Sequence, residues 1–150
     1  MFPSIVIIRK NSDTLISPNF RESEFFTKCP DFRNDNHLLD GRLITAIQAV
    51  RDFIGAPVYI TSSYRTKQCN KDCGGSPGSL HLQGMALDFT TASCNSLIIE
   101  NISQYGKLFL LLHSCGIKGF GLYPAHIHID TRAKGTQSYK QYKFTMWNLN

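Results

Sequence analysis

Three polar side chains alternate with apolar ones near the C-terminal end of the sequence, in His126-Ile-His128-Ile-Asp130. Successive side chains of a β-strand point to opposite faces, so His126, His128 and Asp130 would share one face. Burying three polar groups together is unfavourable unless they are hydrogen-bonded or bind a metal. The alternation therefore predicts a metal centre or a hydrogen-bonded cluster on one face of a strand.

A second block, Ser79-Leu-His81-Leu-Gln-Gly84-Met-Ala-Leu-Asp88, contains further candidate ligands. Gly84 lets the chain bend between His81 and Asp88, and Asp88 begins a segment that can lie beside the strand of His128. Two imidazoles and one carboxylate form a three-ligand zinc site with an open fourth position, which lowers the pKa of a bound water to roughly 7. The spacing thus favours His81, Asp88 and His128 as zinc ligands.

Other interpretations stay open on spacing alone. Two histidines and one carboxylate also form the facial triad of non-haem iron enzymes. A single histidine is more often an ordinary core or surface residue, and His37 and His113 are interpreted in this way. His113 lies near the end of an expected helix, where it complements the helix dipole.

The elements that must position these residues follow from periodicity. Apolar residues at spacings of four, three and four predict a helix from the N-cap Asp40 to Gly55. The remaining expectations are a helix over 103–115, strands over 57–61, 87–91, 117–123 and 126–131, a loop over 66–79, and irregular structure in the first forty residues. The aromatic and basic tail, 133–150, would add an edge strand or cover the core.

These elements predict an α+β fold, because the order of strands and helices shows no regular βαβ alternation. We expect a single domain over residues 1–150, with a mainly antiparallel sheet and helices packed on one side. The hydrophobic content of 42% excludes disorder of the whole chain. No apolar run approaches the ~18 residues of a membrane span, and the first residues do not resemble a signal peptide, so we expect synthesis in the cytoplasm.

Charge and cysteine content give weaker indications. The net charge of +5 suits an acidic partner such as nucleic acid, anionic lipid or an anionic cell-wall polymer, but the basic residues are scattered. Nucleic acid is not expected, because no recognition helix or RNA-binding motif is present. Five cysteines leave at least one free thiol; Cys69 and Cys73 could form a bridge, whereas Cys94 and Cys115 are expected to pack as small apolar groups.

The ligand blocks also resemble a known family. Ser-x-His-x-x-Gly-x-Ala-x-Asp followed by His-x-His is similar to the zinc-dependent D-alanyl-D-alanine carboxypeptidases of peptidase family M15, especially small phage and bacterial members whose C-terminal signature ends in His-x-Asp-Thr-Arg. Further similar segments are Phe20-Arg-Glu-Ser-Glu-Phe25, Ile60-Thr-Ser-Ser-Tyr-Arg65, Asn70 to Gly75 and Gly119-Phe-Gly-Leu-Tyr123. The resemblance covers about 18–132. Ser79–Thr91, Tyr105-Gly106 and Ala125–His128 also resemble the Hedgehog signalling domain, which shares this fold.

The resemblance implies a role for each matching residue. His81, Asp88 and His128 would bind one zinc ion. Arg65 would bind the carboxylate of the substrate or the developing oxyanion, and Ser79 would hydrogen-bond the substrate or brace the ligand loop. Tyr123 would contact the substrate, and His126 would lie beside the metal as a hydrogen-bond donor or stabilise the tetrahedral intermediate. Arg65, His126 and Asp130 are the candidate catalytic residues, although Asp130 is interpreted more readily as a holder of a histidine or an arginine.

One position departs from the family pattern. Many family peptidases carry an acidic general base three residues before the last ligand, where this chain has Ala125, and residues 119–127 contain no carboxylate. Loss of a general base typically lowers a rate about 10²–10⁴-fold.

Taken as a whole, the resemblance implies a zinc peptidase that cleaves peptidoglycan stem peptides at the cell wall, as a monomer, in phage lysis or wall remodelling. The alternative is a zinc-stabilised binding domain of the same fold without turnover.

Overall fold

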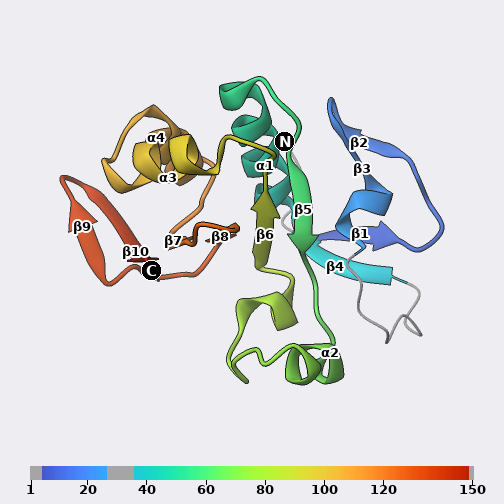
Figure 1. Cartoon of the computed structure of the whole chain (residues 1–150). Helices are drawn as coiled ribbons and strands as arrows, with labels where there is room; N and C mark the ends of the chain where they lie inside the picture. The colour runs from blue at the N-terminus through green and yellow to red at the C-terminus, as the bar shows by residue number, and fades with distance from the viewer. Residues whose placement is uncertain (1–4, 27–35, 149–150) are drawn as a thin grey trace.

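The computed structural model describes residues 5–26 and 36–148 (Figure 1). In chain order the elements are β1 (Ile5–Arg9), β2 (Leu15–Ser17), β3 (Phe20–Arg21), the 3₁₀ turn η1 (Glu22–Phe25), β4 (Asn36–Asp40), α1 (Gly41–Ile54), β5 (Tyr59–Ser62), α2 (Lys67–Asp72), the 3₁₀ turn η2 (Leu80–Gln83), β6 (Ala86–Thr90), α3 (Asn95–Ser103), α4 (Lys107–Ser114), β7 (Gly119–Leu122), β8 (Ile127–Asp130), β9 (Gln137–Tyr139) and β10 (Tyr142–Asn148).

The main sheet has the strand order β5-β6-β8-β7-β10-β9. Neighbouring strands are antiparallel except β7 and β10, which run parallel. Two smaller antiparallel pairs, β1 with β4 and β2 with β3, lie beside it. The predicted α+β class with a mainly antiparallel sheet is confirmed.

One face of the main sheet is covered by α1, α3 and α4. Their buried apolar side chains form a single core with Leu87 and Phe89 of β6 and Ile127 and Ile129 of β8. Figure 1 shows α2 away from these helices, in the connection between β5 and β6. Because side chains alternate along a strand, the residues between these apolar ones point to the other face.

The helix predicted after Asp40 is confirmed as α1. The Asp40 carboxylate accepts a hydrogen bond from the Arg42 backbone nitrogen at 3.0 Å, and Gly55 ends the helix in the left-handed conformation with φ 63°. The Thr131 hydroxyl also donates to Asp40, at 2.9 Å. The start of α1 is therefore tied directly to the end of β8.

Several local expectations are wrong. The described part of the first forty residues forms β1 to β4 and η1 rather than irregular structure. The expected loop over 66–79 contains a helix, α2, because the side chain of its N-cap, Thr66, accepts a hydrogen bond from the Cys69 backbone nitrogen at 3.1 Å. The helix expected over 103–115 is α4 alone and begins at Lys107, because Tyr105 adopts a positive φ of 56° and separates it from α3. The tail does add strands, β9 and β10.

Two further observations concern cysteines and membranes. Cys69 is disulfide-bonded, but Cys73 is a free thiol, so the two do not bridge each other; Cys94 and Cys115 are free and partly buried against the core. Among the helices of the described residues, none combines the length and apolar character that crossing a membrane requires.

Candidate metal centre and cleft

The register of the main sheet places one row of residues side by side across four strands. Asp88 in β6 pairs with His128 in β8, and His128 pairs with Gly121 in β7. Gly121 in turn pairs with Trp147 in β10. Residues in one row point to the same face, here the face opposite the helices. The row therefore brings an acid, an imidazole and an indole together from segments far apart in the sequence.

His81 reaches this row from the turn before β6. It lies in η2, where the Ser79 side chain caps the turn by accepting from the His81 backbone nitrogen at 3.3 Å. Gly84 ends the turn with φ 68°, and a Cβ there would lie 2.4 Å from the Leu38 carbonyl oxygen, so only glycine fits. The bend predicted between His81 and Asp88 is thus confirmed.

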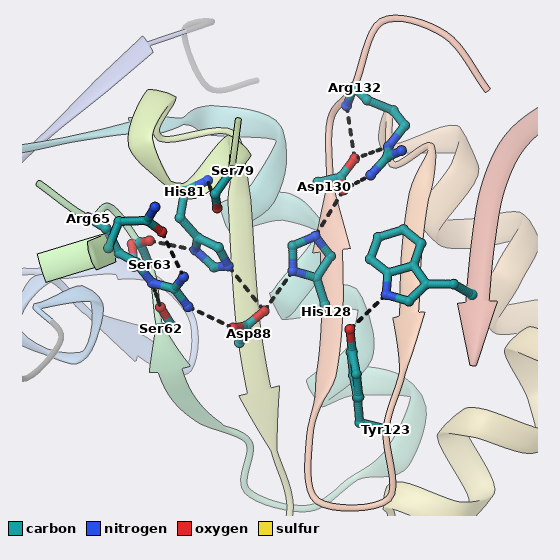
Figure 2. Close-up of polar contacts among 12 residues, drawn as sticks. Ser62, Ser63, Arg65, Ser79, His81, Asp88, Tyr123, His128, Asp130 and Arg132 are labelled. Atoms are coloured by element: carbon teal, nitrogen blue, oxygen red, sulfur yellow. Dashed lines mark hydrogen bonds and ion pairs between the residues drawn. The ribbon is translucent and has the colours of Figure 1, made fainter. Parts of the chain in front are cut away.

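His81, Asp88 and His128, called the ligand triad below, converge on one point (Figure 2). One nitrogen or oxygen atom from each lies within 4.8 Å of the others. The His81 Nε2 atom is 3.3 Å from Asp88 Oδ1, and the His128 Nδ1 atom is 2.8 Å from the same oxygen. All three side chains are largely buried. Two imidazole nitrogens and a carboxylate are donors that suit zinc.

The outer nitrogens of both imidazoles are held by oxygen acceptors. His81 Nδ1 donates to the Ser63 carbonyl oxygen at 2.7 Å, and His128 Nε2 donates to Asp130 Oδ2 at 2.9 Å. The other two ring nitrogens, His81 Nε2 and His128 Nδ1, face Asp88 and are the ones that would bind a metal ion once they carry no proton. Histidines that bind metals are typically oriented in this way, so the chemistry of the triad fits a metal ion.

The electrostatics of the triad favour a cation. Burial acts to raise the pKa of Asp88, but the hydrogen bonds of His128 and His81 outweigh it and hold this pKa below its ordinary value. Burial acts to lower the pKa of His128, but contacts with Asp130 and Asp88 raise it instead. The two carboxylates that favour a proton on His128 would equally favour a metal cation beside it.

Arg65 is fixed beside the triad by three side chains. Its Nε donates to Ser62 Oγ at 2.9 Å, its Nη1 to Asn70 Oδ1 at 3.3 Å, and its Nη2 to Asp88 Oδ2 at 3.4 Å. A guanidinium has five N–H groups, so donors remain for a further partner. Ser62 as a holder of Arg65 was not predicted, because the sequence shows no signal that β5 aims this hydroxyl at the guanidinium.

Asp130 is fully buried and holds two side chains of the site. Besides His128, it accepts from Arg132 Nε at 2.8 Å and Nη2 at 2.7 Å. Burial acts to raise the pKa of Asp130, but Arg132 and then His128 lower it to about 2. Gly119 makes room for this carboxylate, because a Cβ there would lie 2.1 Å from Asp130 Oδ1. These contacts agree with the holding role favoured for Asp130.

The ligand triad lies in a cleft of about 440 Å³. Every residue singled out from the sequence as a site residue lines it: Arg65, Ser79, His81, Asp88, Tyr123, His126, His128 and Asp130. His37 and His113 lie elsewhere; His113 Nε2 contacts the Lys143 carbonyl oxygen at 2.9 Å. The cleft also contains Arg132 and Trp147, which the sequence did not single out.

Comparison with known proteins gives one match. The model of the family described as Peptidase M15 matches residues 18–130. This range includes the ligand triad and Arg65 and stops before Arg132, β9 and β10. No curated protein matches the chain.

Proposed function

The chain belongs to the peptidase M15 family, and from this premise we propose that it is a zinc-dependent peptidase that hydrolyses the stem peptides of peptidoglycan. The observation that carries the proposal is the convergence of the ligand triad, in which each imidazole has its outer nitrogen fixed by an oxygen acceptor. A role in phage lysis or cell-wall remodelling, at the bacterial wall, is part of the same proposal.

His81, Asp88 and His128 would hold the zinc ion. When bound, zinc supplies a Lewis acid that polarises the scissile carbonyl and makes water a stronger nucleophile. Asp130 keeps His128 in the orientation and protonation state that binding requires, and the Ser63 carbonyl does the same for His81. Ser79 braces the turn that carries His81.

Arg65 would bind the substrate. Its side chain is 16% exposed and lines the cleft, and its guanidinium is held by Ser62, Asn70 and Asp88, so it is already oriented before a ligand arrives. A planar guanidinium meets a carboxylate through two parallel hydrogen bonds, and it stabilises a developing oxyanion in the same manner. A peptide with a carboxylate close to its scissile bond is the substrate that this arrangement favours.

His126 would take part in proton transfer or oxyanion binding. Among the described residues that line the cleft, the carboxylates are Asp88 and Asp130, and both are engaged by histidines and arginines. The imidazole of His126 lines the same cleft and stacks on Tyr123 with ring centroids 4.4 Å apart. Because an imidazole nitrogen can accept and donate a proton, His126 can serve where the usual acidic residue is replaced by Ala125.

The same replacement favours a second candidate, a zinc-stabilised binding domain without turnover. Ala125 offers no proton acceptor, and Asp130 is occupied by His128 and Arg132. In this candidate the metal contributes to folding and the cleft binds a partner peptide without cleaving it.

Digestion of purified peptidoglycan tests the two candidates. We expect the zinc-loaded protein to release cleaved stem peptides, the chelated protein to release none, and added zinc to restore release. Asp88→Asn should abolish release, whereas Asp72→Asn, which changes an exposed carboxylate that does not line the cleft, should not. Elemental analysis should give one zinc per chain. A folded, zinc-loaded protein that releases nothing would refute the peptidase and leave the binding domain.

A further inference from the structure

The C-terminal hairpin, β9 with β10, contributes a residue to the cleft from outside the segment that matches the family. Trp147 of β10 lines the cleft, and the centroid of its ring lies 5.2 Å from that of His128. It is also the only tryptophan in the sequence. The parallel pairing of Trp147 with Gly121 places it in the same row as His128.

The indole of Trp147 is held in place on several sides. Its Nε1 donates to the Tyr123 hydroxyl at 2.8 Å, and the Arg132 guanidinium carbon lies 5.1 Å from the ring centroid. The ring occupies the space that Gly121 leaves free, since a Cβ at Gly121 would lie 2.8 Å from the indole Cε2 atom. Because a tryptophan has one N–H, the indole has no donor left for a ligand.

The hairpin that carries Trp147 is anchored firmly. Phe144 is buried in the main core, and Tyr139 stacks on Tyr105 with ring centroids 4.3 Å apart. His113 of α4 contacts the Lys143 carbonyl oxygen at 2.9 Å. Trp147 is therefore a fixed surface of the cleft rather than a side chain that can move aside at little cost.

The two sides of the cleft differ in chemistry. Figure 2 shows Arg65, Ser79 and His81 on one side of Asp88, and Tyr123 and Arg132 on the other. The first side also carries the small residues Gly75, Ser76 and Gly78. The second side, called the aromatic side below, carries Tyr123, His126 and Trp147, together with Arg132, whose guanidinium is paired with the buried Asp130. One side thus suits an anion, and the aromatic side suits an apolar group.

We propose that Trp147 is a specificity-determining residue, whose indole contacts the side chain next to the scissile bond and admits small aliphatic side chains such as that of alanine. The inference rests on the proposed function, because it assumes a peptide with its scissile bond at the ligand triad and its carboxylate on Arg65. A fixed ring in the wall of the cleft limits the size of a substrate side chain beside it, and the indole N–H, which already donates to Tyr123, gives no hydrogen bond to a polar side chain.

Selectivity between paired peptides tests the role of Trp147. The pair consists of a stem peptide that the wild-type protein cleaves and the same peptide with leucine in place of the alanine next to the scissile bond. We expect the wild type to prefer alanine by about tenfold or more in kcat/KM, and Trp147→Ala to remove most of that preference. Trp147→Phe should give an intermediate ratio and serves if the alanine variant folds poorly.

Met146→Ala is the matched control. Met146 precedes Trp147 in β10, packs against the core and does not line the cleft, so its truncation weakens the same strand from the other face. We expect this variant to lose stability but to keep the wild-type selectivity ratio. Equal loss of kcat/KM for both peptides in Trp147→Ala, with the ratio unchanged, would overturn the proposal.

Tryptophan emission separates the two proposals. Since the chain has a single tryptophan, a saturable change in emission on adding the alanine peptide to the zinc-free wild-type protein reports contact at Trp147. A saturable change supports the contact even if the zinc-loaded protein cleaves no peptide, and that lack of cleavage would refute the peptidase alone. Cleavage of the peptide without any change in emission, at concentrations that saturate the enzyme, would overturn the contact and leave the peptidase intact.

Discussion

The two faces of the main sheet are built from the same strands and from opposite kinds of residue. On the helix-covered face, Leu87, Phe89 and Ile129 are fully buried apolar side chains. On the other face, Asp88 and Asp130 occupy the alternate positions, and both are also buried. Burial stabilises the first face directly, whereas the second is stable only because its charges are paired with each other.

The two faces therefore contribute differently to the stability and the chemistry of the protein. The apolar face supplies the free energy of folding and sets the register, and the register then determines which polar residues meet on the other face. A metal ion would add stability to the polar face alone. Substitutions on the two faces should therefore differ in how their effects depend on zinc.

The largest effect is expected on the apolar face. Phe89→Ala removes a fully buried ring and should lower the free energy of unfolding by about 3–5 kcal/mol. Because Phe89 points away from its neighbour Asp88, the loss should be the same with and without zinc. Denaturant unfolding of both forms measures it. A loss that zinc abolishes would show that the faces are not independent.

The next effect is expected on the polar face, at His81. With zinc present at a hundred times its Kd, the wild-type protein should gain about 2.7 kcal/mol of stability, and His81→Ala should gain none. His113→Ala, which removes a histidine outside the cleft, should keep the full gain. Thermal unfolding with and without zinc measures the difference. Equal gains in His81→Ala and the wild type would remove His81 from the ligand triad.

The ligand triad could be predicted because two signals combine: local patterns indicate the candidate side chains, and the resemblance to peptidase family M15 assigns His81, Asp88 and His128 to one metal ion. The alternation of His126, His128 and Asp130 assigns a shared face without knowledge of the partner strand, and Gly84 indicates the bend that follows His81. Helix α1 was predictable from local patterns alone, since its N-cap, its apolar spacing and its final glycine lie in one short segment.

Trp147 could not be predicted, because its position depends on a pairing between distant segments. Only the parallel alignment of β10 with β7 brings it beside His128, and no local pattern specifies that alignment. The glycines at 119 and 121 do carry a signal: they alternate with Phe120 and Leu122 and leave space on the polar face for large neighbours. Helix α2 was missed because it has six residues and an almost entirely polar sequence, and α3 because its nine residues are too few for the helical spacing of Ile98 and Ile102 to stand out.

Asp130 provides a finer test of the polar face. Asp130→Asn should weaken zinc binding about 10–100-fold, because the amide holds His128 less well than the carboxylate does. A general base would behave differently: the same change would lower kcat and leave the zinc Kd unaltered. Measuring the zinc Kd together with kcat at saturating zinc separates positioning from proton transfer. Asp72→Asn, outside the cleft, is the matched control.

The smallest effect is expected at Glu22, a buried carboxylate that belongs to neither face of the main sheet. Arg9 donates to it from Nε at 3.1 Å, and this hydrogen bond lowers the pKa of Glu22 from 4.5 to about 2. A lowered pKa means that the charged form stabilises the fold above pH 4.5, and that this contribution is lost as the pH falls toward 2. Glu22→Gln should therefore be less stable than the wild type at neutral pH, and the difference should disappear on acidification. Because Glu22 lies outside the cleft, zinc should not change that difference; a difference that persists at pH 2 would mean that Glu22 acts through packing rather than through its charge.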